Sequence, residues 1–495
     1  MNLNQQPEAK ATMIERLDAL YEYDREPVSE KKLHGWKTFI GMFSGEHVAG
    51  TEFVLGFLLF RHGVSGQDLI WGLLIGNILA VLSWAFFCAP VGVKTRLTIY
   101  WLIKKVCGSY ITIIYSALYA IVLCLLAGAM VYVAVTSIAI PFGVENPHYP
   151  VDVLPGLPWI LIAIFVGAVI SVIAVLGFEK MAHFAKVCAP WMAFIFLACA
   201  IAVLPRIQIH SWADFWNKAP VEIFRGVPME GFSKYTIWHV IGLAWLCNAP
   251  QHIGMSDITV FRYAKNWKLG FASAFGMFIG HFGAWIASYI MVAAYYSLTG
   301  NANLQPGDVA YFAAGLAGAI CVIVAGWTTA NPTLYRVGLA LQVLTPNWKR
   351  WKITFVAGFF MIVAACIPAV VHNLDRIVAY NGIVFVPLGA FIFVDLWIFP
   401  KLKMSTYFAE KKGLPLSWPS LLAWVFSFLI CFFFYAKDNI DIFVTMCQGN
   451  LPRWIANIKT DLMYLLAPEW ILAVLFYIGF SYIQQNNFNR KGGRA

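Results

Sequence analysis

Polar residues and glycines interrupt an apolar segment near the start of the chain. Glu46 and His47 lie between Gly45 and Gly50, and apolar residues continue on both sides. A charge within a membrane-embedded apolar segment costs about 2.5 to 3.5 kcal/mol, so such a residue usually faces a cavity and has a function. The two glycines make local unwinding of a helix easy. We therefore predict a broken helix that places Glu46 and His47 at a binding site.

A second apolar segment is interrupted in the same way from Cys247 to Gly254, and the apolar run resumes at Met255. Pro250 lacks an amide hydrogen and clashes with the preceding helical turn, so the helix should break just before it. Two interrupted helices five segments apart are typical of secondary transporters built from inverted repeats, in which unwound backbone forms a substrate and ion site. The alternative is a pair of kinked helices packed by satisfied polar groups.

A third group of residues places several oxygen atoms close together within one apolar segment. Thr328 and Thr329 carry adjacent hydroxyls, and the carbonyl of Ala325 lies one turn earlier. Hard oxygen ligands suit an alkali cation better than imidazole or thiolate would. Threonine hydroxyls also bond back to carbonyls of their own helix, so residue chemistry leaves both interpretations open.

Membrane-spanning helices must position these residues. Hydrophobic residues make up 60% of the 495-residue chain, and charged residues only 12%. A helix needs about 20 apolar residues to cross the hydrocarbon core, and helices are favoured because lipid offers the backbone no hydrogen-bond partner. We predict an all-α integral membrane protein with twelve transmembrane helices, at residues 38–60, 69–93, 110–142, 157–177, 184–204, 236–260, 269–299, 307–344, 353–373, 377–400, 415–436 and 467–486.

The distribution of charge predicts the orientation. With the N-terminus in the cytoplasm, most of the 35 basic residues fall on the cytoplasmic side, as the positive-inside rule requires. This bias and anionic lipid account for the net charge of +10, so no nucleic-acid partner is expected. We predict a multi-pass protein of the cell (inner or plasma) membrane with both termini cytoplasmic.

Several short motifs lie along the first ten predicted spans. They are Ile75-Gly76-Asn77, Gly92-Val93-Lys94-Thr95, Ala139-Ile140-Pro141-Phe142-Gly143, Val260-Phe261-Arg262-Tyr263-Ala264-Lys265, Trp327-Thr328-Thr329 with Leu334-Tyr335, and Pro387-Leu388-Gly389 before Asp395. In this order they resemble the nucleobase:cation symporter-1 family, closest to its bacterial cytosine permease branch.

The resemblance implies a LeuT-like fold of two inverted five-helix repeats plus two further helices, working by alternating access. It implies a cytoplasmic N-terminal tail (1–37) and a transport core of ten helices (38–400). Two additional helices with an outer amphipathic segment (401–486) and a cytoplasmic tail (487–495) would follow.

The resemblance also assigns site residues. Sodium ligands carried over by position are the carbonyls of Glu46, Ala49 and Ala325 and the hydroxyls of Thr328 and Thr329. Substrate contacts fall near the first break and on the second break, with one residue from span eight. Together with the polar residues of both breaks, the candidate substrate-binding set is Glu46, His47, Gly50, Thr51, Trp245, Asn248, Gln251, His252 and Asn331.

The chain also departs from the family pattern. Family members commonly hold a flat heterocycle between aromatic residues of spans three and six, but the matching part of span three, Ala127 to Tyr132, contains no tryptophan. Tyr132 and Trp245 are the nearest candidates. Glu46, His47 and His252 are not part of the cytosine pattern, so the substrate prediction stays at the level of a class.

The predicted function is import of a nucleobase or related small nitrogen heterocycle by cation symport. Sodium is the expected coupling ion and a proton is the alternative. The alternative cargo is a small cationic amine or guanidino compound bound by Glu46 or Glu52. An enzyme is not expected, because the chain shows no HExxH, paired-acid or nucleophile motif. The other histidines, His281 among them, are expected to be packing or interface residues.

Overall fold

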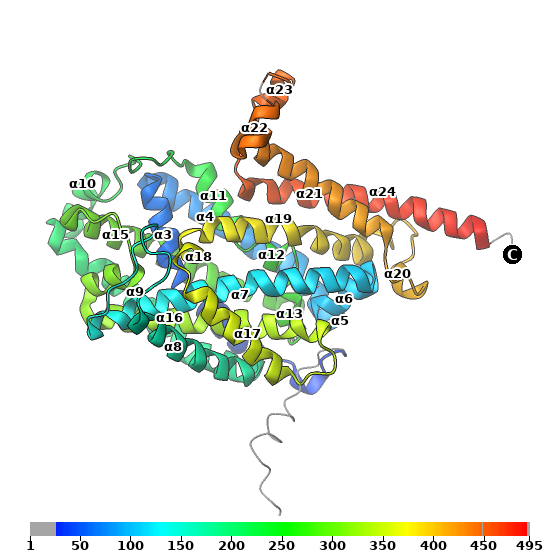
Figure 1. Ribbon diagram of the computed structural model, residues 1–495, viewed down its shortest axis with the longest axis horizontal. Helices are drawn as coiled ribbons and strands as arrows, with labels where there is room; N and C mark the ends of the chain where they lie inside the picture. The colour runs from blue at the N-terminus through cyan, green and yellow to red at the C-terminus, as the bar shows by residue number, and fades with distance from the viewer. Residues whose placement is uncertain (1–25, 448, 493–495) are drawn as a thin grey trace, which may run out of the picture.

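The computed structural model describes residues 26–447 and 449–492. Within these ranges the chain forms helices joined by turns, and no β-strand is present. The long helices lie side by side through the body of the molecule (Figure 1). The predicted all-α fold class is confirmed.

Nine helices among the described residues are long and apolar enough to cross a membrane. They are Gly66–Thr95, Ser109–Phe142, Leu157–Val175, Phe178–Ile207, Trp267–Thr299, Pro306–Leu344, Leu374–Ile398, Trp418–Asn439 and Leu462–Phe488. Each overlaps a predicted span, so the protein is a multi-pass membrane protein. The other predicted spans, at 38–60, 236–260 and 353–373, are divided into shorter helices. The count of twelve crossings therefore stays a prediction.

The first broken helix lies where the sequence predicts it. Helix α2 (Trp36–His47) and helix α3 (Thr51–Arg61) are separated by three residues. A Cβ atom at Gly50, within this break, would lie 2.7 Å from Val133 Cγ1 and 3.3 Å from the amide nitrogen of Gly326. Glycine therefore lets the break pack directly against α7 (Ser109–Ala139) and α16 (Pro306–Leu344).

The second broken helix has two gaps instead of one. Helix α11 (Ile237–Leu246) ends before Pro250, as predicted, and the short helices α12 (Ala249–His252) and α13 (Ile258–Phe261) follow. The gap between α12 and α13 contains Met255 with a φ of 64°. The amide of Asp257 donates to the Gln251 carbonyl at 3.1 Å and helps to close this turn. The apolar run that resumes at Met255 is therefore helical only from Ile258.

Helix α16 contains a kink that divides its 39 residues. A straight helix of this length would extend about 58 Å, well beyond a hydrocarbon core of about 30 Å. The kink lies at Ala314 and Gly315, and Gly315 has a φ of 59°, which glycine adopts without a steric penalty. The segment after the kink carries the threonines of the predicted ion site.

The remaining spans surround the two broken helices and α16. They comprise α4 (Gly66–Ser83) with the π-helical η2 (Trp84–Cys88) and α5 (Ala89–Thr95), α8 (Leu157–Val175), α9 (Phe178–Val203), the π-helical η6 (Gly276–Ala284) with α15 (Trp285–Thr299), α17 (Arg350–Ala365), α18 (Pro368–His372) and α19 (Leu374–Phe393) with η7 (Val394–Ile398). Helix α6 (Ile99–Cys107) connects α5 to α7.

Two further helices lie along one edge of the bundle in Figure 1, coloured orange and red. Helix α21 (Trp418–Asn439) packs against α24 (Leu466–Gly492), and α24 also contacts α19. Between them, α22 (Asp441–Cys447) and α23 (Arg453–Ala456) project away from the body. Helix α24 continues past residue 486, where the sequence predicts its end.

The predicted N-terminal tail is only partly described. The amide of Val28 donates to the Arg96 carbonyl at 3.1 Å, and the amide of His34 donates to the Tyr263 carbonyl at 2.7 Å. Residues 26–37 therefore pack against the body of the protein. The predictions for residues 1–25 and 493–495 lie outside the described residues.

Candidate functional site

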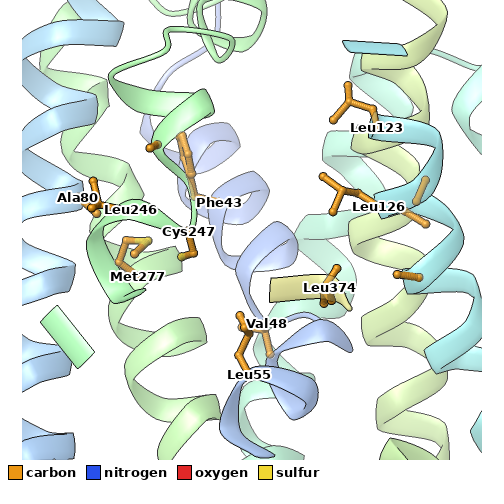
Figure 2. Close-up of a cluster of buried hydrophobic side chains, with 14 of the residues drawn as sticks. Phe43, Val48, Leu55, Ala80, Leu123, Leu126, Leu246, Cys247, Met277 and Leu374 are labelled. Atoms are coloured by element: carbon orange, nitrogen blue, oxygen red, sulfur yellow. The ribbon is translucent and has the colours of Figure 1, made fainter. Parts of the chain in front are cut away.

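A cavity of about 90 Å³ lies where the two broken helices meet. Its walls come from α2, α3, α7, α16 and α19, from the π-helical η2 and η6, and from the second broken helix between its first gap and Asp257. Figure 2 shows apolar side chains of this region, with Leu123 and Leu126 from α7 and Leu55 from α3. Six of the predicted site residues line the cavity: Glu46, His47, Thr51, Asn248, Gln251 and Thr329.

Arg336 of α16 binds carboxylates from both broken helices. Its Nη1 donates to Glu46 Oε1 at 2.6 Å, and its Nη2 donates to Asp257 Oδ1 at 2.7 Å. Nη2 also lies 3.3 Å from Glu46 Oε2, which makes the Glu46 contact bidentate. The indole nitrogen of Trp84 donates to the other oxygen of Asp257 at 2.8 Å. These contacts hold the two breaks against α16, and Arg336 neutralises Glu46.

Glu52 belongs to a second polar cluster on the cavity wall. Its carboxylate accepts a hydrogen bond from the indole nitrogen of Trp285, and Oε1 lies 3.8 Å from His281 Nε2. The same His281 nitrogen lies 3.3 Å from Asn248 Nδ2. The rings of His281 and His47 are 5.1 Å apart between centroids. The cluster thus joins α3, η6 and the second broken helix.

Two amide side chains on the cavity wall have unused hydrogen-bonding atoms. Gln251 Oε1 and Asn381 Oδ1 are buried without a hydrogen-bond partner, and both residues line the cavity. Because buried polar atoms in native proteins almost always have partners, such atoms suit a bound ligand. Amides can donate and accept at once. Asn331 is also buried with both ends unbonded, but it does not line the cavity.

Four of the five predicted sodium ligands are close to one another. The hydroxyls of Thr328 and Thr329 donate to the Ala325 carbonyl at 3.1 and 3.0 Å. The Thr329 hydroxyl also lies 3.3 Å from the Glu46 carbonyl. The fifth group, the carbonyl of Ala49, accepts the Glu52 amide at 3.1 Å. These hard oxygens fit an alkali cation, although the bonds within α16 are also those that helical threonines form alone.

Trp245 and His252 support the second break and do not line the cavity. The amide of Ile253 donates to His252 Nδ1 at 2.9 Å, so Nε2 carries the proton and donates to the Trp245 carbonyl at 2.9 Å. The indole of Trp245 donates to Ser83 at 3.1 Å. Tyr132 donates to Gln305 at 3.3 Å and lies outside the lining as well. Substrate binding by these residues stays a prediction, as it does for Gly50.

Sequence reasoning missed two charged residues of the site. Asp257 lies within an apolar run, and Arg336 lies near the end of the predicted span at 307–344. Both are charges in apolar segments, and the cost argument applied to Glu46 identifies them as candidates too. Trp84 and His281 also line the cavity, but a lone aromatic residue or histidine in an apolar run carries no comparable signal.

Two further spaces lie between the central cavity and one face of the protein. A wide vestibule of about 1140 Å³ is lined in part by Arg61 and Asp375, which also line a small pocket of about 40 Å³. That pocket shares Leu55 and Leu374 with the central cavity. These two leucines therefore separate the cavity from the pocket that leads to the vestibule. The predicted topology places this face outside the cell.

The chain is similar in fold to solved structures of membrane transporters. One is Mhp1, a nucleobase-cation-symport-1 family transporter, in a closed conformation with bromovinylhydantoin bound. The TM-score is 0.66 at 14% identity, over 93% of this chain and 95% of that chain. Mhp1 in an inward-facing conformation gives 0.64 at 14% identity, over 94% and 95%. A substrate-bound, outward-open Na⁺-coupled sialic acid symporter gives 0.62 at 11% identity, over 90% and 89%.

These likenesses show that the chain shares the fold of these membrane transporters. No protein-family model matches the sequence, and no curated protein matches it by sequence. The predicted place in the cytosine permease branch therefore stays a prediction.

Proposed function

We propose that the protein is a secondary active transporter that imports a nucleobase or a related small nitrogen heterocycle by sodium symport with alternating access. The observation that carries this proposal is the cavity at the junction of the two broken helices. The cavity is lined by amide, hydroxyl and carboxylate groups from both breaks. Unwound helices that meet at one site are the arrangement on which alternating access depends in transporters of this kind.

The chemistry of the cavity wall favours a heterocycle as cargo. Leu123, Leu126 and Met130 supply an apolar surface for a ring face. Asn248 and Gln251 supply amides for a ring edge, where nitrogen and carbonyl groups both donate and accept hydrogen bonds. The bromovinylhydantoin bound to Mhp1 is a small nitrogen heterocycle as well, and this supports the same class of cargo.

Sodium is the coupling ion in this proposal. The carbonyls of Glu46 and Ala325 and the hydroxyls of Thr328 and Thr329 would hold it. Because Glu46 also lines the cavity, the ion would sit beside the substrate site and link the two binding events. The fold neighbour described as a Na⁺-coupled symporter supports this choice of ion.

A thermal-shift screen of the purified protein tests the proposal. Nitrogen heterocycles are added in sodium buffer and in choline buffer, and the unfolding temperature is recorded. A bound ligand stabilises the folded state by an amount that grows with the ratio of its free concentration to its dissociation constant. We expect at least one heterocycle to stabilise the protein more strongly in sodium, because ion and cargo favour the same conformation. If no heterocycle shifts the unfolding temperature in either buffer, the proposal is wrong.

A further inference from the structure

Glu52 is a buried carboxylate on the cavity wall, and within the described part of the chain it has no fixed cationic partner. It is 4% exposed, and its carboxylate contacts Trp285 and His281. The indole of Trp285 is a neutral donor. Of these two contacts, only His281 could carry a positive charge.

The hydrogen bonds of His281 indicate a neutral imidazole. Its Nε2 lies 3.3 Å from Nδ2 of Asn248, and an amide nitrogen can only donate. Nε2 must then accept, and the ring proton lies on Nδ1, which is buried without a partner. A neutral His281 leaves the charge of Glu52 uncompensated.

The charge balance of the whole cavity leads to the same conclusion. Among the described lining residues, three are carboxylates, Glu46, Glu52 and Asp257, and one is a guanidinium. Arg336 is already bound to Glu46 and Asp257. A sodium ion beside Glu46 would offset one further negative charge, and one would remain. A buried charge in a protein is paired or is removed by a proton, and a cationic cargo would pair with the remaining carboxylate.

We propose that the transported compound is a nitrogen heterocycle that carries a positive charge, and that the carboxylate of Glu52 binds this charge. This inference rests on the proposed function and narrows its cargo. The ring would lie against the apolar wall while its cationic nitrogen faces Glu52. A neutral nucleobase would leave the Glu52 charge unpaired and would bind more weakly.

Two rings of equal size test the charge directly. At neutral pH 4-aminopyridine is a cation, whereas 4-aminopyrimidine is neutral. Each is titrated into the purified protein in sodium buffer, and the dissociation constant is measured by calorimetry. The cation should bind about tenfold more tightly or better, which corresponds to about 1.4 kcal/mol. In Glu52→Gln this preference should disappear.

Glu469→Gln is the matched control. Glu469 lies in α24, is fully buried, and has no hydrogen-bond partner for either carboxylate oxygen, but it does not line the cavity. This variant should keep the preference for the cation. Equal binding of the two rings to the wild type, or a preference that persists in Glu52→Gln, overturns the inference.

The two proposals fail in different ways. If the neutral ring binds in sodium as tightly as the cation, the inference about Glu52 is wrong while heterocycle transport stands. If neither ring nor any other heterocycle binds, the proposed function is wrong as well. The wild-type comparison decides between these results even if Glu52→Gln does not fold.

Discussion

At the scale of single residues, Arg336 is the side chain on which the site depends most. It is 3% exposed and pairs with two carboxylates, Glu46 of the first broken helix and the buried Asp257 of the second. Removing one partner of a buried ion pair costs about 3 to 5 kcal/mol, because the remaining charges lose their compensation. We therefore expect Arg336→Gln to lower the unfolding temperature strongly, as measured by differential scanning fluorimetry in detergent.

Matched variants separate the loss of the Arg336 ion pairs from the effect of removing any arginine. Arg336→Lys keeps the charge but loses the bidentate contact, so it should be intermediate. Arg453→Gln removes an exposed arginine of α23 and should leave stability nearly unchanged. The triple variant Arg336→Gln, Glu46→Gln and Asp257→Asn should recover part of the loss. An unfolding temperature of Arg336→Gln equal to that of the wild type would contradict the buried network.

The residue scale also shows where sequence reasoning ended. Glu46 was predicted because a charge in an apolar segment is costly, whereas Asn248 and Gln251 were predicted from the second break and the family resemblance. All three line the cavity. The contact between Glu46 and Arg336 joins residues 290 positions apart. Only the packing of α16 against the first break brings them together, and no local pattern encodes that packing.

At the scale of the elements, the second broken helix depends on a close backbone contact with α19. A Cβ atom at Gly389 would lie 2.1 Å from the carbonyl oxygen of Ile253. Because backbone cannot move aside cheaply, Gly389→Ala should displace the gap between α12 and α13. We expect a lower unfolding temperature and weaker heterocycle binding in this variant, measured by fluorimetry and calorimetry.

Gly479→Ala is the control for that prediction. Gly479 lies in helix α24, and a Cβ atom there would meet no atom within 4 Å. Alanine in a helix is favoured over glycine by about 0.5 to 1 kcal/mol, so this variant should be neutral or slightly more stable. Equal behaviour of the two variants would show that the Gly389 contact does not support the break.

The gap in the first broken helix and the gap before Pro250 in the second broken helix were predictable from the sequence. The gap between α12 and α13 and the kink in α16 were not. Glycine, as at Gly50, makes local unwinding and close backbone packing easy, and proline, as at Pro250, breaks the hydrogen bonding of a helix. Met255 has a positive φ although nothing in its side chain favours that conformation. It is the hydrogen bond from the Asp257 amide and the packing of Gly389 that support this turn. At Ala314 and Gly315 a single glycine gave too weak a signal.

At the scale of the whole molecule, the path from the vestibule to the cavity passes two leucines. Leu55 and Leu374 line both the cavity and the small pocket before it, and both are labelled in Figure 2. We expect Leu55→Ala and Leu374→Ala to widen this path. Cys247 lines the cavity, so a polar thiol reagent added on the predicted outer side should label it faster in both variants, as quantified by mass spectrometry.

Leu197→Ala provides the comparison for that experiment. Leu197 of α9 is 57% exposed on the surface of the helical body and does not line any of these spaces. Its substitution should leave the labelling rate of Cys247 at the wild-type value. If the three alanine variants label Cys247 at the same rate, the two leucines do not limit access to the cavity.

Sodium-driven uptake into proteoliposomes tests the central claim most directly. Labelled 4-aminopyridine or 4-aminopyrimidine, whichever stabilises the purified protein more, is supplied outside with an inward sodium gradient or with choline. We predict faster uptake with the gradient in the wild type and in Thr345→Ala, because the Thr345 hydroxyl donates to the Leu341 carbonyl at the end of α16 and does not line the cavity. The double variant Thr328→Ala, Thr329→Ala should lose the effect of sodium while remaining folded. Uptake that is equally dependent on sodium in the double variant, or independent of sodium in the wild type, would contradict the account.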